Sequence, residues 1–384
     1  MAKPLPTPPH ASRILVRGVN WLGDAVMTTP ALLRLREKFP AAHIAILTPE
    51  KICELWSQHP AVDEIIPFKT SENVFAIGKK LRTKKFDLAL VLPNSPRSAL
   101  EVFLALIPQR IGYARPWRNF FLTQTVLPRA GTVKMRKLPV AEIQSRIAKE
   151  TQSTQRNNLK PDDLCGSVAK SSVHQIHEYL HLIAALGANP EPLPPQLFIT
   201  DEEVENTKRK FSLEKIEGPL FGLNPGAEYG VAKRWPVEKF ISAAKEIQAK
   251  TNCVWILFGG KNDSGITSQI ESAIHNPQST VFNLAGKTSL RELMALLKIC
   301  RVLLTNDTGP MHVAAALGAP VVVPFGSTSP ELTAPGLPGD PRNHLLKSDA
   351  PCSPCFLREC PIDFRCMNGI SVERVVEAIL QSVR

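Results

Sequence analysis

The chain has 384 residues, a formal net charge of +11 and a pI of about 9.3. Hydrophobic residues make up 43% of it and charged residues 21%, which excludes an intrinsically disordered protein and is typical of a folded one. The length exceeds one ordinary hydrophobic core, so two domains are expected. The positive charge favours an anionic partner, which leaves nucleic acid, an acidic membrane surface or a phosphorylated substrate open.

No stretch approaches the roughly 18 uninterrupted apolar residues that span a bilayer. The first residues, "MAKPLPTPPHASR", also lack the apolar core of a signal peptide. These features predict a cytoplasmic protein whose basic surface is free to touch a membrane.

Strand-like and helix-like segments alternate through the first half of the chain. Apolar, β-branched runs alternate with a segment of helical periodicity at 29–39; the runs lie at 13–18, 43–48, 86–93 and 109–114. Such alternation predicts βαβ units and therefore a parallel sheet.

The alternation restarts after a proline-rich stretch at 187–200. Strands are expected at 218–226, 253–260, 301–307 and 319–326, with helices at 237–250 and 291–300. We therefore predict an α/β protein with two Rossmann-like domains at 1–190 and 201–366, joined by a proline-rich linker at 191–200. A helix is expected within the remaining residues, 367–384.

The segment 129–165 is basic, polar and only weakly periodic, which favours a surface loop or lid over core structure. Two interpretations remain open for it. It is either a clamp for an anionic acceptor or a solvated insertion without a function of its own.

Three turns follow predicted strands, where α/β sheets bind their ligands. The first is "RGVNWLGDAVMTTP", in which Gly18 and Gly23 flank a turn and Asp24 begins a helix. It is not GxGxxG, so a nicotinamide site is not favoured. Asp24 is either a helix N-cap or a general base for an acceptor hydroxyl.

The second turn is "LNPGAEYGVAKRWP", where a strand ends in Asn-Pro-Gly and Lys233 and Arg234 follow. Backbone N–H groups near Gly226 together with Lys233 form a candidate diphosphate cradle. The alternative is an exposed loop with Trp235 packed beneath it.

The third turn is "TNDTGPMHVAAALGAPVVVPFG". Asp307 can cap the following helix, Thr308 and Gly309 open it, and His312 falls one turn in. Helix N-termini bind anions. A capping Asp and a core His would explain two of these residues separately, but the four together favour a diphosphate site.

Eight cysteines divide into two sets. Four lie apart and are expected to be reduced core thiols, at Cys53, Cys165, Cys253 and Cys300. The other four lie in "PCSPCFLRECPIDFRCMNG", at Cys352, Cys355, Cys360 and Cys366. The first pair has the spacing of a zinc or iron–sulfur knuckle, while the later spacings fit no template. A structural metal or redox site and a metal-free thiol loop both stay open.

The stretches "NWLGDAVMTTPALLRLRE", "NPGAEYGVAKRWP" and "TNDTGPMHVAAALGAPVV" resemble the three sequence blocks of the lipopolysaccharide core heptosyltransferases, glycosyltransferase family 9. The second block is most similar to the type II members. The resemblance implies a GT-B architecture, in which two Rossmann-like domains with parallel sheets face each other across a cleft. It also implies an inverting transfer that needs no cofactor or catalytic metal.

The implied donor is ADP-L-glycero-β-D-manno-heptose, and the implied acceptor is heptosyl-Kdo2-lipid A at the cytoplasmic face of the inner membrane; no nucleic-acid partner is expected. By this resemblance Asp24 is the general base, Lys233 binds the donor phosphates, and Gly226, Asp307, Thr308, Gly309 and His312 complete the donor site. The last helix would return to the first domain. Gly23, Asn224 and Glu228 are further candidates.

The sequence departs from the family at "GGKNDSG", where a glutamate that contacts the adenosine ribose in type I enzymes is missing. Asp263 is the candidate in its place. Three alternatives remain: a type I or III heptosyltransferase, another nucleotide-sugar GT-B transferase with a UDP or GDP donor, and a non-catalytic protein that binds anionic ligands on an inactive GT-B scaffold.

Overall fold

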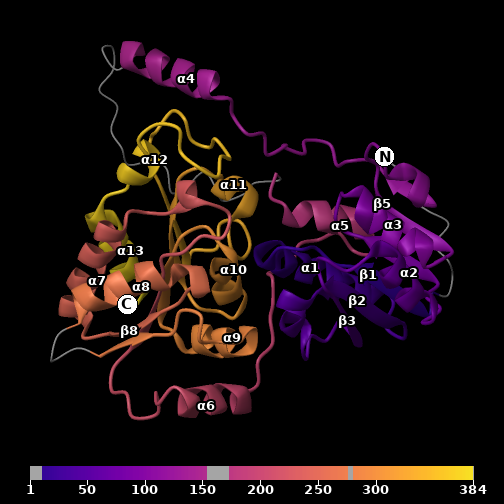
Figure 1. Cartoon of the computed structure of the whole chain (residues 1–384), viewed down its shortest axis with the longest axis horizontal. Helices are drawn as coiled ribbons and strands as arrows, with labels where there is room; N and C mark the ends of the chain where they lie inside the picture. The colour runs from indigo at the N-terminus through magenta and orange to yellow at the C-terminus, as the bar shows by residue number, and fades with distance from the viewer. Residues whose placement is uncertain (1–10, 154–172, 276–279, 384) are drawn as a thin grey trace. The chain divides into compact units, whose positions relative to one another are not determined.

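The computed structural model describes residues 11–153, 173–275 and 280–383 (Figure 1). Two compact units divide these residues. The first unit contains the described residues up to Thr132 and those from 173 to Phe198, and the second contains the remainder. Cys165 and residues 154–165 of the basic segment lie outside the described residues.

The first unit is built on a six-stranded parallel sheet in the order β3-β2-β1-β4-β5-β6. Helix α1 packs on α5, and α2 packs on α3. The elements of this unit are β1 (Arg13–Arg17), α1 (Leu22–Lys38), β2 (His43–Pro49), η1 (Glu50–Trp56), β3 (Glu64–Phe68), α2 (Val74–Arg82), β4 (Leu88–Val91), α3 (Pro96–Leu104), β5 (Gln109–Tyr113), η2 (Asn119–Phe121), β6 (Gln124–Val126) and α5 (Ile176–Ala184).

The second unit has a six-stranded parallel sheet in the order β12-β11-β10-β7-β8-β9. Figure 1 shows α7, α8 and α13 on one face of this sheet and α9 and α10 on the other. The elements are α4 (Val140–Ser153), α6 (Asp201–Lys210), β7 (Leu220–Asn224), η3 (Val231–Lys233), α7 (Val237–Thr251), β8 (Val254–Leu257), η4 (Lys261–Asp263), α8 (Ser264–Ile274), β9 (Val281–Asn283), α9 (Leu290–Ile299), β10 (Val302–Thr305), α10 (Gly309–Ala316), β11 (Val321–Phe325), α11 (Pro330–Thr333), β12 (Asn343–Lys347), α12 (Arg365–Asn368) and α13 (Val372–Ser382).

Both sheets therefore have the Rossmann strand order, in which the first strand lies in the middle and the fourth lies beside it. The middle strands are apolar on both faces because helices cover each face; every residue of β4, β8 and β10 is buried. This confirms the predicted α/β fold class. In such sheets the ligand site lies at the switch point, here between β1 and β4 and between β7 and β10.

The basic segment departs from its prediction as a surface loop in the first domain. Residues 140–153 form helix α4, and Ile143 is buried with Leu138 against Cys352 and Cys355 of the second unit. The Leu138 N–H also donates to the Cys355 carbonyl at 3.0 Å. A single apolar edge on an otherwise polar helix is enough for this packing, and it is easily missed in a basic sequence.

The C-terminal helix α13 packs within the second unit. Its main packing partners are α7 and strands β10, β11 and β12, all in that unit. Its buried residues Val375, Val376, Ala378 and Ile379 join the core of the unit. The second sheet thus covers the apolar face of α13, and the expected return to the first domain stays a prediction. Among the described residues, none of the helices combines the length and apolar content that crossing a bilayer requires.

Candidate functional site

In the second unit, the predicted donor residues gather at the ends of two neighbouring strands. Strand β7 ends at Asn224 and β10 ends at Thr305, and these two residues are paired in the sheet register. The turn after β7 leads to Lys233, and the turn after β10 leads to Asp307. The pairing of β7 with β10 thus brings together two turns that are far apart in the sequence. They meet at the switch point, where α/β folds bind ligands.

Lys233 and Asp307 form the centre of this cluster. The Lys233 Nζ lies 2.6 Å from Asp307 Oδ2, and both side chains are largely buried. The same carboxylate oxygen accepts a hydrogen bond of 2.6 Å from the Thr328 hydroxyl, which follows β11. The ammonium also lies 5.0 Å from the centre of the Tyr229 ring. Lys233 is therefore held in one place as a point charge for an anion.

Asn306 ties the two turns together. Its side chain is fully buried, and Nδ2 donates to the Pro225 carbonyl at 2.8 Å while Oδ1 accepts from the Trp235 N–H at 2.9 Å. Asn224 donates to the Thr305 hydroxyl at 3.0 Å and is also buried. The Asn306 amide thus satisfies backbone groups that the turn would leave unpaired, and Asn224 supports the turn through the Thr305 side chain.

Gly226 lies against Asp263, which follows β8. A Cβ at residue 226 would overlap the Asp263 carboxylate, so only glycine fits here. Asp263 pairs with Arg234 at 3.2 Å and accepts from the Gly260 N–H at 3.0 Å. This places Asp263 next to the turn, as its candidacy for a ribose contact requires. Glu228 is exposed on the same turn.

The start of α10 differs in detail from the prediction. Thr308, and not Asp307, occupies the N-cap position, and Asp307 is engaged by Lys233 instead. Gly309 and Pro310 follow, and Pro310 has no N–H, which leaves the amides of Thr308 and Gly309 at the open end of the helix. His312 lies in the first turn and is buried.

A loop near the C-terminus supports the Lys233 turn from behind. The Ala232 N–H donates to the Arg358 carbonyl at 3.0 Å, and the Tyr229 hydroxyl donates to the Phe356 carbonyl at 2.8 Å. Gly230 passes so close to Arg358 that a Cβ would overlap its carbonyl. Nothing in the sequence signalled this support, because the two segments share no motif.

In the first unit, Asp24 lies in the first turn of α1, two residues after its start at Leu22. The N-cap is Trp21, so the alternative of Asp24 as an N-cap is wrong. Asp24 is half-buried, and Oδ1 accepts a long hydrogen bond of 3.4 Å from Gln175 Nε2. Gln175 also donates to the Tyr179 hydroxyl at 2.8 Å. Gly23 occupies the second position of the helix.

The partners of Asp24 come from α5 and the residue before it, far along the chain. Tyr179 is buried, and burial together with the nearby Asp24 charge raises its pKa well above the usual range. Tyr179 therefore stays a neutral hydroxyl at any physiological pH. The first turn of a helix also favours a carboxylate charge, since the N-terminal amides point toward it.

A buried ion pair supports the turn between β1 and α1. The Arg17 Nε lies 2.7 Å from Glu101 Oε2, and both side chains are almost fully inaccessible. The same guanidinium donates to Asn20 Oδ1 at 2.9 Å. Removing one partner would leave the other charge buried and unpaired, so this pair fixes the chain just before Asp24.

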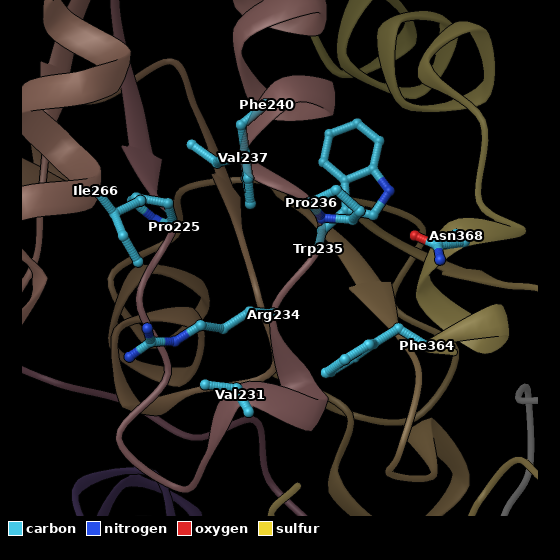
Figure 2. A pocket seen from close by; sticks show the side chains of 10 residues that line it. All are labelled: Pro225, Val231, Arg234, Trp235, Pro236, Val237, Phe240, Ile266, Phe364 and Asn368. Atoms are coloured by element: carbon cyan, nitrogen blue, oxygen red, sulfur yellow. The ribbon is translucent and has the colours of Figure 1, made fainter. Parts of the chain in front are cut away.

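A pocket of about 310 Å³ lies beside the Lys233 turn (Figure 2). Its side chains come from the turn after β7, from α7, from α8 and from α12, and most of them are apolar. The lining residues are Pro225, Val231, Arg234, Trp235, Pro236, Val237, Phe240, Ile266, Phe364 and Asn368. The sequence did not predict this pocket because its walls come from separate segments.

The four clustered cysteines line one small cavity. The Cys366 thiol donates to Cys352, which lowers the pKa of Cys352 to about 7 and raises that of Cys366. The Phe364 N–H donates to Cys360 at 3.3 Å. Within the described ranges, no group of three or more His, Cys, Asp or Glu is arranged to hold a metal ion. The zinc or iron–sulfur interpretation gains no support, and these four residues are described as free thiols.

Of the scattered cysteines, Cys253 and Cys300 are buried free thiols and Cys53 is half-buried. Burial raises the pKa of Cys253 to about 11 and that of Cys300 to about 12. Cys253 and Cys300 thus match the expectation of reduced core thiols, whereas Cys53 is a free thiol outside the core.

Comparison with known proteins gives one consistent result. The model of glycosyltransferase family 9 (heptosyltransferase) matches residues 162–364. Lipopolysaccharide heptosyltransferase 2 of Escherichia coli K12 is 33% identical over 332 residues, covering 84% of this chain and 85% of that protein.

Solved structures agree with this result. The structure of E. coli ADP-heptose LPS heptosyltransferase II has a TM-score of 0.73 and 30% identity, covering 97% of this chain and 98% of that one. A family 9 glycosyltransferase from Veillonella parvula DSM 2008 has a TM-score of 0.75 at 21% identity, covering 97% of each chain, which is a likeness of fold.

Proposed function

Because the chain belongs to glycosyltransferase family 9, the heptosyltransferases, and has the parallel sheets of the GT-B fold, we propose that it acts as a type II enzyme. It transfers L-glycero-D-manno-heptose from ADP-heptose to the heptosyl-Kdo2-lipid A inner core of lipopolysaccharide. Heptose transfer in lipopolysaccharide synthesis follows from its relatives. The acceptor type, the donor contacts, inversion and metal independence are our proposals.

The observation that carries the donor site is the Lys233–Asp307 pair at the β7/β10 switch point. Lys233 would contact the donor diphosphate. The backbone N–H groups of Thr308 and Gly309 at the start of α10 would donate hydrogen bonds to the same diphosphate. Gly226 allows close approach of the backbone, and Asp263 is placed to receive a ribose hydroxyl. Asn224, Asp307 and His312 would hold this arrangement from beneath.

In the proposed reaction, the acceptor hydroxyl attacks the anomeric carbon from the face opposite ADP. Asp24 removes the hydroxyl proton as the new bond forms, a role commonly worth about 10²- to 10⁴-fold in rate. Negative charge grows on the leaving diphosphate. Lys233 and the two amides stabilise that charge through fixed, preorganised dipoles, so the transfer would not depend on a divalent cation or other cofactor.

The acceptor is a lipid, and the chain carries a net charge of +11. We propose that the enzyme works at the cytoplasmic face of the inner membrane through peripheral contact, since anionic lipid attracts a basic surface.

The test is transfer from ADP-heptose to heptosyl-Kdo2-lipid A in the presence of EDTA, read by product mass. We expect product from the wild type and a loss of at least about a hundredfold in Asp24→Ala. ADP binding measured in parallel should be the same for both proteins.

Two outcomes would contradict the proposal. Wild-type protein that binds ADP but uses only an acceptor without heptose would be a type I enzyme, and one that binds ADP without turnover on any core acceptor would be a binding protein on an inactive scaffold. Product that disappears with EDTA and returns with magnesium would refute metal independence alone.

A further inference from the structure

An exposed aromatic and basic segment, residues 115–121 with the sequence RPWRNFF, crosses the first unit between β5 and β6. We propose that this segment is the surface by which the protein docks on an anionic phospholipid membrane. The inference rests on the proposed function, in which the acceptor is a lipid, and it names the surface that would contact the membrane.

Two aromatic side chains of the segment face solvent. Trp117 is 89% exposed and Phe120 is 81% exposed, the largest exposures among the apolar side chains of the described residues. Phe120 lies 6.0 Å from Phe103 of α3 and 5.6 Å from Phe121, ring centre to ring centre. The rings of Phe103, Phe120 and Phe121 thus form one group, and the exposed Trp117 lies on the same short segment. Exposed apolar groups gathered on a surface are typical of a binding site.

The segment is built to hold Trp117 outward. Trp117 has a φ of 63°, a left-handed conformation that bulky residues rarely adopt. The next residue, Arg118, is fully buried and donates to the Pro93 carbonyl at 2.7 Å. The Arg115 N–H donates to Asn119 Oδ1 at 2.9 Å and closes the turn. A turn fixed by these contacts therefore presents the indole to solvent, and a backbone held in a rare conformation is a feature from which function can be inferred.

The stretch of the first unit that carries these rings has basic residues and no acidic ones. From residue 102 to residue 132 the sequence has no Asp or Glu, and it has four basic residues, Arg110, Arg115, Arg118 and Arg129, of which Arg129 pairs with Glu178. Arg110 lies 5.3 Å from the Phe103 ring. Among the described ion pairs, none involves Arg110, Arg115 or Arg118. Arg110 and Arg115 are partly exposed cations beside exposed aromatic rings, whereas Arg118 is buried. This arrangement matches an anionic lipid surface, where the rings enter the interface and the two exposed cations meet the head groups.

The aromatic part of this surface is tested by sedimentation of the full chain with vesicles of phosphatidylcholine, with or without about 30 mol% phosphatidylglycerol. We expect the wild type to bind only the anionic vesicles and to be released by about 0.5 M salt. The double variant Trp117→Ser/Phe120→Ser should bind them at least about tenfold more weakly. Val140→Ser, an exposed apolar residue of the second unit, is the matched control and should bind as the wild type does.

The contribution of positive charge is tested with Arg115→Glu. We expect the affinity of this variant for anionic vesicles to fall by about tenfold or more. Lys245→Glu, on the exposed side of α7, is the matched control, and its affinity for anionic vesicles should fall much less. Thermal unfolding of all variants shows whether each is folded. If the Arg115 variant fails to fold, salt titration of the wild type shows whether its binding to anionic vesicles depends on charge.

Turnover separates docking from catalysis. On a water-soluble acceptor without acyl chains, the turnover of the double variant should match that of the wild type. On acceptor embedded in vesicles, its turnover should fall by about tenfold. Unchanged vesicle binding by the double variant would overturn the proposal. So would a wild type that ignores vesicles while the variant alters its oligomeric state, since the segment would then bind protein. Vesicle binding needs no heptose transfer, so docking can hold even if the proposed function fails.

Discussion

The two sheets have the same strand order, yet their ligand ends are built in different ways. In the second unit, Lys233, Asp307 and Thr328 all follow strands, and the sheet brings them together directly. In the first unit, Asp24 follows β1, but its described partner Gln175 precedes a helix that is distant in sequence. A strand-end cluster is fixed by the sheet, whereas the surroundings of Asp24 depend on how α5 packs on α1. This difference is consistent with our proposal that the second unit binds the donor and the first performs proton transfer.

The largest effect should come from Asp24→Asn, which keeps the shape of the side chain but removes its ability to accept a proton. We expect kcat to fall by about 10²- to 10⁴-fold while the affinity for ADP stays unchanged. Steady-state kinetics and calorimetric titration with ADP measure the two quantities. A variant that loses ADP affinity and keeps kcat would reverse the roles given to the two units.

Lys233→Ala should have the next largest effect, because it removes a fixed charge from the donor site. We expect kcat/KM for ADP-heptose to fall by about 10²- to 10³-fold, with weaker ADP binding. Arg234→Ala is the neighbouring control and should have a smaller effect on kcat/KM. Equal losses in the two variants would mean that general positive charge, and not the position held by Asp307, attracts the donor.

Gln175→Ala should have a moderate effect confined to kcat. Gln175 is a positioning residue, since it donates to Asp24 and to Tyr179, and its loss should lower kcat by about tenfold or less. ADP affinity and the midpoint of thermal unfolding should change little. A variant with a lower midpoint and normal kcat would show that the residue supports only the packing of α5.

The smallest effect concerns stability away from either site. Arg291 holds the pKa of Glu203 at about 2, and Thr200 donates to the same carboxylate. Since the folded pKa lies below the ordinary value, the stabilisation is full above about pH 4.5 and is lost as the pH falls toward 2.

Glu203→Gln should therefore lower Tm by about 2–4 °C at pH 7, and the difference should shrink below about pH 4.5. Glu205→Gln, which breaks an exposed pair with Lys208, should change Tm much less. A difference that persists at low pH would show that the capping geometry, and not the charge, stabilises α6.

The sequence predicted the elements that obey a periodic rule. The buried strands around β1, β7 and β10 could be read from apolar runs, and the turns after them from glycine and polar residues. Helix α4 was missed because one buried residue, Ile143, anchors it within a basic segment. The packing of α13 on the second sheet was not predicted, because an apolar face shows that a helix is covered but not by which sheet.

The donor cluster could be predicted only in part for a related reason. Lys233 and Asp307 lie in turns with a clear signature, so their positions after strands could be predicted. Thr328, Asn306 and Arg358 act through single hydrogen bonds that join separate segments, and no local pattern records such a bond. Gln175 is the extreme case, since only the packing of α5 on α1 brings it near Asp24.

The packing of Leu138 and Ile143 against Cys352 and Cys355 has a consequence for how the protein is made. The ribosome releases Leu138 and Ile143 soon after the first sheet is complete, but Cys352 and Cys355 emerge only after the last strand of the second sheet, β12. Until then, these two apolar side chains have no cover from their native partners, which makes the nascent chain prone to association. An isolated fragment ending near Phe198 would likewise carry a segment whose native partners are missing.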